Sequence, residues 1–130
     1  VAPSIPGVLQ RFFGEDEPDT LMIRVRRKHP VSRDRIREFD VIAVTPGFVY
    51  VNETKSTLRA EYVTAFADNY REVTEFFPEF AEKPIVPIMS SLYISPELLA
   101  LLTQHRVYAM GMGKDTMDLL NFDTVHQTKG

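Results

Sequence analysis

Hydrophobic and polar residues alternate with the two-residue period of a β-strand near the start of the chain. The segment TLMIRVRR, residues 20–27, predicts a half-exposed strand that Pro30 ends. Its two predicted faces are formed by alternate residues: Leu21, Ile23 and Val25 on one, and Met22, Arg24 and Arg26 on the other. Before this strand, a short amphipathic helix is predicted from residues at the spacing of one helical face: Val8, Leu9, Phe12 and Phe13.

Two more β-prone segments, EFDVIAV (38–44) and FVYVNETKS (48–56), flank the turn sequence Thr45-Pro46-Gly47. Proline fixes φ and glycine accepts a positive φ, so the pair predicts a turn and the two segments predict an antiparallel hairpin. Pro-Gly suits a type II turn better than the primed turns of tight hairpins. We therefore expect a loop that can be wider than two residues.

The period changes to that of a helix over residues 59–77, where an apolar stripe predicts about five turns. The stripe consists of Tyr62, Phe66, Tyr70, Val73 and Phe77. A buried strand follows in KPIVPIMSSLYI (83–94), and then a helix in which Ser95 is the N-cap and Pro96 the first helical residue. RVYAMGMG (106–113) predicts a short strand, and residues 115–122 a last turn of helix or a closing segment.

The predicted order is α-β-β-β-α-β-α-β, which indicates an α/β fold with a mixed central sheet and flanking helices. At 130 residues the whole chain, 1–130, fits one domain with a core of its own. The sequence opens with VAPSIPG and has no initiator methionine, which suggests processing or the C-terminal part of a longer protein.

Composition narrows the class of protein further. The chain is 44% hydrophobic and 25% charged, and no apolar run approaches the roughly 20 residues that span a bilayer, so no membrane partner is expected. Cysteine is absent, which excludes disulfides and Cys-based zinc sites and makes a cytoplasmic location the expectation.

Positive charge is concentrated in one stretch although the net charge is −3. Seven of the 15 lysines and arginines lie in RVRRKHPVSRDRIR, with only Asp34 against them: Arg24, Arg26, Arg27, Lys28, Arg33, Arg35 and Arg37. This patch can hold the phosphates of a nucleic acid. A solvated strand and loop is the alternative, and the sequence leaves both open.

The hairpin brings two acidic residues together. If the turn is symmetric about Pro46 and Gly47, the numbers of paired residues sum to 93, and Asp40 lies opposite Glu53. Opposite side chains have Cβ atoms about 4.5 to 5.5 Å apart, where like charges repel by a few kcal/mol at an effective dielectric of about 20. Lys55 is on the same face as Glu53 and offsets part of this repulsion, and a hard, oxygen-binding cation such as Mg²⁺ would offset more of it.

Asp40 followed by Glu53-Thr54-Lys55 near the end of the next strand resembles the PD-(D/E)xK nuclease superfamily, which has the restriction-endonuclease-like fold. EFDVIAVTPGFVYVNETKSTL and IVPIMSSLYISPELLALLTQHRVYAMGMG in particular look like nuclease-like domains of uncharacterised bacterial proteins. The resemblance implies that Asp40, Glu53 and the Thr54 carbonyl bind Mg²⁺ or Mn²⁺ and that Lys55 assists the attacking water. It implies hydrolysis of phosphodiester bonds, most readily in DNA, and it is compatible with a homodimer that cuts two strands.

The chain departs from the family pattern in two places. Phe39 precedes Asp40 where the family has proline, and the first helix carries no glutamate, with only Glu15 and Glu17 after its end. A further acidic ligand can therefore be missing or lie before Val1. Because the superfamily includes members that lost catalysis, an inactive binding or assembly module is the alternative to a nuclease.

Overall fold

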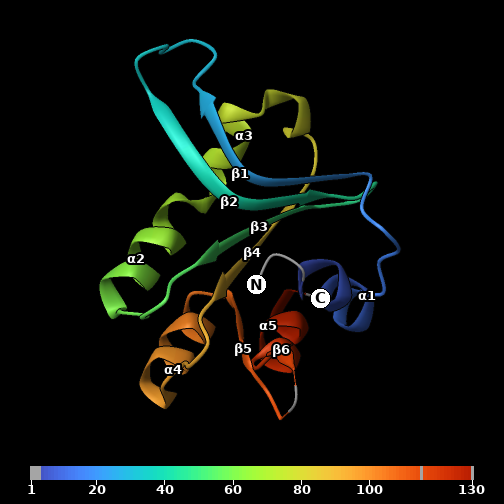
Figure 1. Cartoon of the computed structure of the whole chain (residues 1–130), viewed down its shortest axis with the longest axis vertical. Helices are drawn as coiled ribbons and strands as arrows, with labels where there is room; N and C mark the ends of the chain where they lie inside the picture. The colour runs from blue at the N-terminus through green and yellow to red at the C-terminus, as the bar shows by residue number, and fades with distance from the viewer. Residues whose placement is uncertain (1–3, 115, 130) are drawn as a thin grey trace.

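Six strands form one mixed sheet in the computed structural model, which describes residues 4–114 and 116–129 (Figure 1). The strands lie side by side in chain order: β1 Thr20–Lys28, β2 Ile36–Val44, β3 Val49–Thr54, β4 Ile85–Ser90, β5 Tyr108–Met112 and β6 Met117–Leu119. The first three are antiparallel, β3, β4 and β5 are parallel, and β6 is antiparallel to β5. This arrangement confirms the predicted mixed α/β sheet.

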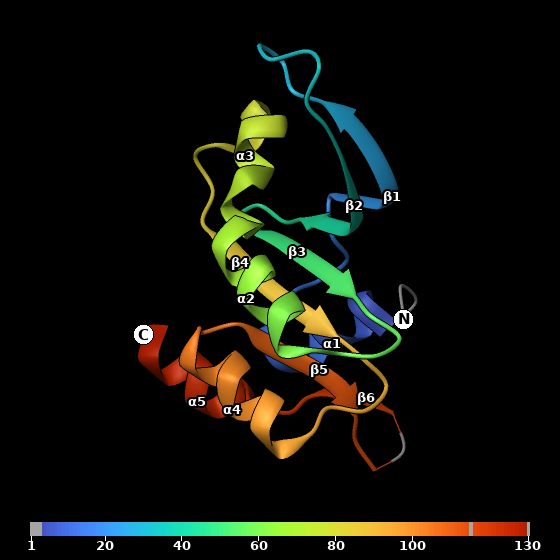
Figure 2. The same cartoon turned by 90° about the vertical axis from the view of Figure 1, so that its left-hand side faces the viewer.

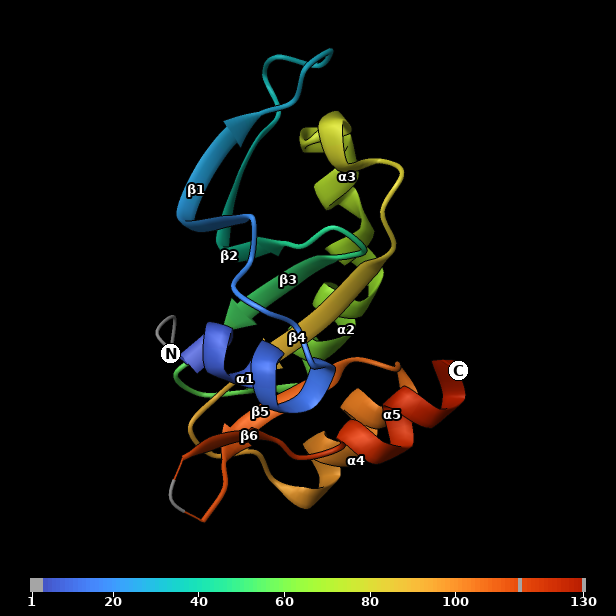
Figure 3. The same ribbon diagram turned by 90° about the vertical axis from the view of Figure 1, so that its right-hand side faces the viewer.

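Helices cover both faces of the sheet (Figures 2 and 3). The helical segments are α1 Ser4–Phe13, α2 Ala60–Asn69, η1 Tyr70–Glu72, α3 Val73–Phe76, η2 Pro78–Phe80, α4 Pro96–Gln104 and α5 Phe122–Lys129. One core cluster joins α2, α3 and α4 to the sheet, and a second joins α1 and α5 to its other face. No helix in the described part of the chain is long and apolar enough to cross a membrane.

The predicted five-turn helix is interrupted after Asn69 by the 3₁₀ segment η1. In a regular helix the N–H of Val73 would donate to the Asn69 carbonyl, but here it donates to the Tyr70 carbonyl. The Asn69 carbonyl instead accepts a 3.1 Å hydrogen bond from the Arg37 guanidinium. A side chain from β2 thus replaces one helical bond, which is a common cause of such a break. Burial of the apolar stripe is nevertheless as predicted for Phe66, Tyr70 and Phe77.

The Pro46-Gly47 turn is a two-residue loop and not the wider type II turn that we expected. Gly47 does not have a positive φ, and the N–H of Thr45 donates to the Phe48 carbonyl at 3.0 Å. The return N–H of Phe48 donates to the Thr45 hydroxyl at 3.2 Å, and the Thr45 carbonyl accepts a hydrogen bond from the Lys83 ammonium at 2.6 Å. A lysine remote in sequence therefore contributes to this turn.

The predicted faces of β1 are wrong beyond its middle. Met22 and Val25 pack against the same core cluster although they are three residues apart, while Leu21 and Ile23 are exposed. Arg24 between them has a φ of 53°. A residue in the left-handed region breaks the alternation of a strand, so the side chains change face at this point.

Helix α4 has the predicted N-terminus and an unexpected C-terminus. The Ser95 hydroxyl accepts a hydrogen bond from the Leu98 N–H, and Pro96 is the first helical residue. At the other end Arg106 has a φ of 60°, and the Val107 N–H donates to the Leu102 carbonyl at 3.0 Å. This is the Schellman motif, in which glycine is the usual residue at the position of Arg106.

The closing segment is a strand and a helix, and not a helical turn over residues 115–122. Met117–Leu119 pairs with β5, and α5 begins at Phe122. Asp115, in the same predicted segment, lies outside the described residues. A three-residue strand is too short to produce a detectable alternation in the sequence.

Candidate functional site

The predicted register of the central hairpin is correct. Val41 pairs with Asn52 and Val44 with Val49, so the paired numbers sum to 93, and Asp40 and Glu53 are the next residues after the last backbone pair. The Asp40 carboxylate also accepts a 2.8 Å hydrogen bond from the Thr54 N–H. The two predicted metal ligands and Thr54 are therefore brought together where β2 and β3 stop pairing through their backbones.

Asp40 lies at a bend that both strands of the first hairpin share. The β1–β2 ladder pairs Ile23 with Val41, then resumes at Val25 with Phe39, which leaves Arg24 and Asp40 at the interruption. In β2, as in β1, two residues three apart, Phe39 and Ile42, pack into the same core cluster. Beyond the bend the hairpin, residues 25–39, forms an arm that runs past α3, as Figures 1 and 2 show.

Glu53 lies in an environment that does not fully compensate its charge. Its side chain is 31% exposed. Burial raises the pKa of the Glu53 carboxyl above its usual value, and Asp40 raises it further, while the positive charges of Lys55 and Arg37 lower it. The carboxylate would therefore be stabilised by additional positive charge at this point.

Lys55 completes the group but does not form a tight ion pair. Its ammonium is 3.9 Å from a Glu53 carboxylate oxygen and 4.5 Å from the centre of the Tyr62 ring in α2. A cation over an aromatic face is attracted to the ring while it keeps its charge. Tyr62 was predicted as part of the apolar stripe of its helix, and its role as a platform for Lys55 requires the tertiary structure.

The donor set fits a magnesium ion only in part. Asp40 uses one oxygen for the Thr54 N–H, which leaves its other oxygen and the Glu53 carboxylate as hard donors for an ion that retains several waters. In residues 4–114 and 116–129 no group of three or more acidic, histidine or cysteine side chains is placed to bind a metal. Two carboxylates, with carbonyl and water ligands, are what these residues can offer.

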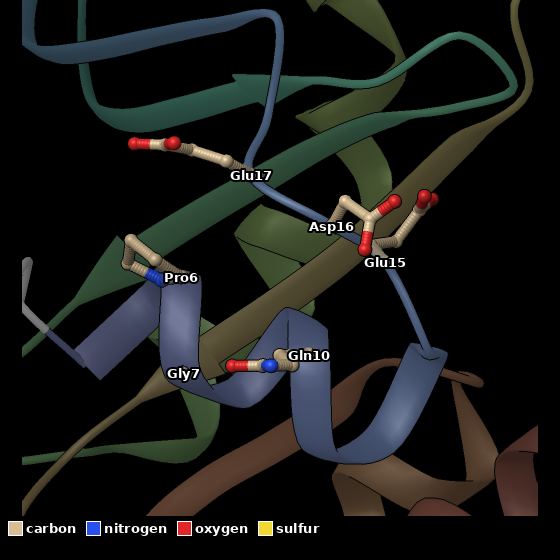
Figure 4. Close-up of a pocket in the computed structure, with 6 residues that line it drawn as sticks. All are labelled: Pro6, Gly7, Gln10, Glu15, Asp16 and Glu17. Carbon is tan, nitrogen blue, oxygen red and sulfur yellow. The ribbon is translucent and has the colours of Figure 1, made fainter.

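The acidic residues after α1 do not supply a third ligand. Glu15 accepts hydrogen bonds from the hydroxyls of Thr45 and Tyr50, at 2.9 and 2.8 Å, beside the hairpin turn. This is the opposite end of β3 from Glu53. Figure 4 shows Glu15, Asp16 and Glu17 along the segment that leaves α1, beside a small pocket that Gln10 also lines. Burial raises the pKa of the Tyr50 hydroxyl, and the bond to Glu15 raises it further, so Glu15 serves as a half-buried acceptor at the turn.

The seven basic residues of the predicted phosphate-binding patch divide into two groups. Three contact acidic residues on and beside α3: Arg27 with Glu79 at 2.9 Å, Arg35 with Glu75 at 3.5 Å, and Arg37 with Glu72 at 2.9 Å. The other four are exposed and have no ion pair within the described part of the chain: Arg24, Arg26, Lys28 and Arg33. The first group holds the arm against α3, and the second is free to contact a ligand.

A buried polar pair on the other face of the sheet was not predicted. The Asn52 side chain, 2% exposed, donates to the Ser90 hydroxyl at 2.5 Å and to the Ile88 carbonyl at 3.2 Å. These bonds join the ends of β3 and β4 on the face opposite Glu53. No pattern in the sequence distinguishes Asn52 from an exposed residue at a strand end.

Comparison with known proteins identifies no family for this chain. No protein-family model and no curated protein sequence matches the chain. Among solved structures, the chain is similar to the small subunit of a heterodimeric restriction endonuclease, with a TM-score of 0.43 and 13% identity, over 99% of this chain and 68% of that one. A likeness this distant does not bear on function, which has to be argued from the site.

Proposed function

We propose that this protein is a metal-dependent nuclease of the PD-(D/E)xK type that hydrolyses phosphodiester bonds in DNA. Asp40 and Glu53 would hold Mg²⁺ or Mn²⁺, with the Thr54 carbonyl as a further ligand. One observation carries the proposal: Asp40 and Glu53 directly follow the last backbone pair of β2 and β3, where the Thr54 N–H binds Asp40 and the Lys55 ammonium is 3.9 Å from Glu53. Acidic pairs across a ladder destabilise a fold, so their placement at the same strand ends as a lysine favours a ligand-binding role.

Each residue of this group has a task that follows from its contacts. The Thr54 N–H orients the Asp40 carboxylate, so that its second oxygen is held in place before any ligand arrives. Lys55, held over the Tyr62 ring, supplies a positive charge for a phosphate oxygen and a hydrogen-bond donor that orients a water. A bound divalent ion would lower the pKa of a water and neutralise charge on the phosphate.

The four exposed basic residues support a nucleic acid as the substrate. Arg26 and Lys28 alternate along β1 with Val25, which packs on the α3 side, so they face the other side of the arm. The arm begins at the bend that also holds Asp40. Lys55 packs on Tyr62 of α2, so a nucleic acid that contacts both Lys55 and these basic residues would pass around the bend to the side of the arm away from α3.

The second candidate function is a binding module that keeps this fold without turnover. It is favoured by the set of two carboxylates, because no third acidic side chain joins them in the described residues. Such a module would still bind nucleic acid through Arg26 and Lys28. Cleavage therefore distinguishes the two candidates, and binding alone does not.

The experiment combines thermal unfolding with a cleavage assay. We expect Mn²⁺ or Mg²⁺ to raise the melting temperature of the wild type but not that of Asp40→Asn or Glu53→Gln, and to support cleavage of plasmid or single-stranded DNA. Glu82→Gln, at an exposed position away from the site, is the matched control and should respond to metal as the wild type does. No metal-dependent shift and no cleavage with either ion would reject the nuclease.

A further inference from the structure

Tyr93 is an exposed aromatic residue in the loop between β4 and α4, and Ile94 next to it is buried. Its side chain is 74% exposed, and within the described chain it has neither a ring contact nor a hydrogen bond. Its loop is nevertheless anchored on both sides. Ile94 is buried in the core, and the Leu92 carbonyl accepts a hydrogen bond from the Met112 N–H at 3.2 Å. The ring is thus presented to solvent by a backbone that is fixed.

A pocket of about 380 Å³ lies next to this ring. It is lined by Ser56, Thr57, Leu58, Tyr93, Ser95 and Leu98. Its size is in the range of small-molecule sites. The hydroxyls of Ser56 and Thr57 have no hydrogen-bond partner in the part of the chain that the structure describes, so polar donors and acceptors line an otherwise apolar wall.

The pocket begins one residue after the proposed catalytic residue Lys55. Ser56 directly follows Lys55, and the Lys55 N–H donates to the Ser90 carbonyl at 2.9 Å, next to the loop that carries Tyr93. The parallel strands β3 and β4 end at this same edge of the sheet. A phosphate at Lys55 would therefore place the attached nucleoside within reach of the pocket.

We propose that this pocket binds an unpaired nucleobase, which stacks on Tyr93, and that the substrate is accordingly single-stranded nucleic acid. The inference rests on the proposed function, because it takes the phosphate position from Asp40, Glu53 and Lys55. A tyrosine ring can cover a base only where no neighbouring base already does, which excludes the interior of a duplex. Stacking on aromatic rings with backbone contact to basic residues is a general means of binding single strands.

The test measures binding without metal, so that it does not depend on cleavage. Fluorescence anisotropy in EDTA would compare a labelled single-stranded oligonucleotide, the same strand with abasic sites, and its duplex. We expect Tyr93→Ala to weaken binding of the intact single strand on the order of tenfold and Tyr93→Phe to bind as the wild type does. Binding of the abasic strand and of the duplex should not change.

The matched control is Phe48→Ala, which removes an aromatic ring that is 40% exposed at the opposite end of β3. It should bind the intact single strand as the wild type does. The inference is overturned if Tyr93→Ala binds the intact single strand normally, if intact and abasic strands lose equal affinity, or if the wild type prefers the duplex. These results are independent of the nuclease assay. Base-dependent binding without cleavage would reject the proposed nuclease and support the base-binding pocket. Cleavage without any effect of Tyr93 would support the nuclease and reject the base-binding pocket.

Discussion

The Thr54 N–H donates a 2.8 Å hydrogen bond to the Asp40 carboxylate, where a regular ladder would use a backbone carbonyl. The bond lies at the bend of Arg24 and Asp40, where the β1–β2 ladder is interrupted. Backbone pairing between β2 and β3 ends one residue earlier, at Val41 and Asn52. One side chain thus closes the hairpin at its open end and takes part in the candidate site. The structural and the ligand-binding roles of Asp40 can be separated by substitution.

Asp40→Ala is expected to lower the free energy of unfolding by about 1–2 kcal/mol in EDTA, because it leaves the half-buried Thr54 N–H without its acceptor. Asp40→Asn keeps an acceptor oxygen and removes the charge. It should change stability by less than about 0.5 kcal/mol, since the relief of repulsion from Glu53 and the weaker hydrogen bond oppose each other. Urea unfolding of the three proteins measures both values. Equal stability of the Ala variant and the wild type would contradict the role of Asp40 at the strand end.

Glu53→Gln is expected to stabilise the metal-free protein at neutral pH, by less than about 1 kcal/mol. Because the folded-state pKa of Glu53 is raised by burial, the neutral form is favoured in the folded state. The contribution of Glu53 to stability is present below its usual pKa of 4.5 and is lost as the pH rises through the raised value. The wild type and the Gln variant should therefore be equally stable below about that pH and diverge above it.

Urea unfolding across pH in EDTA measures this divergence, and Glu82→Gln provides the matched control at an exposed carboxylate. A Gln variant that is less stable than the wild type at neutral pH would show that the attraction of Glu53 to Lys55 and Arg37 outweighs its burial. The site would then not lack positive charge.

Local patterns were sufficient to predict the order of the main elements and the register of the central hairpin. The register followed from one symmetric turn, and it placed Asp40 opposite Glu53 without any knowledge of the third dimension. The bend at Arg24 could not be predicted, because arginine rarely has a positive φ and nothing nearby in the sequence requires it. The break after Asn69 depends on Arg37, which is 32 residues away, and so was equally hidden.

The same limit applies to the candidate site. Asp40, Glu53 and Lys55 were identified because they are close along one hairpin, whereas Tyr62 and the Tyr93 loop reach the site only through the packing of α2 and the β4–α4 connection. The basic patch was predicted as one group, but it divides into two because strand alternation places Arg27 and Arg26 on opposite sides of the arm. Only the position of α3 and its acidic residues shows that the side with Arg27 is already paired within the protein.

Arg106→Gly is expected to raise the free energy of unfolding by about 1 kcal/mol. The residue has a φ of 60° at the end of α4, where a side chain costs roughly 1–2 kcal/mol that glycine avoids, less the greater freedom of glycine in the unfolded chain. Arg106→Ala keeps the strained backbone and serves as the control, with stability close to that of the wild type. Chemical unfolding distinguishes them, and a Gly variant no more stable than the Ala variant would contradict the positive φ.

Tyr62→Leu is expected to slow metal-dependent cleavage a few-fold and to leave the metal-induced rise in melting temperature unchanged. The ring positions the Lys55 ammonium through a contact worth about 0.5–1 kcal/mol at a partly exposed site, and within the described residues its hydroxyl has no hydrogen bond to Asp40 or Glu53. Tyr62→Phe keeps the ring and should cut at the wild-type rate. A loss of activity in the Phe variant as well would assign the effect to the hydroxyl and not to the platform.

The two groups of basic residues in the arm should respond differently to substitution. Arg26→Ala and Lys28→Ala are each expected to weaken DNA binding, and each should reduce the slope of log affinity against log salt by about one if one phosphate contact is lost. Neither should change the melting temperature, because neither side chain has an ion pair in the described residues.

Arg37→Ala should instead lower the free energy of unfolding by about 1 kcal/mol, since it removes the bonds to Glu72 and to the Asn69 carbonyl. Glu72→Ala is the matched partner: it should destabilise the arm in the same way while DNA affinity at a given salt concentration is retained or increased, because it removes negative charge. If Arg37→Ala and Glu72→Ala both lowered DNA affinity with unchanged stability, the division of the patch into a docking group and a binding group would be wrong.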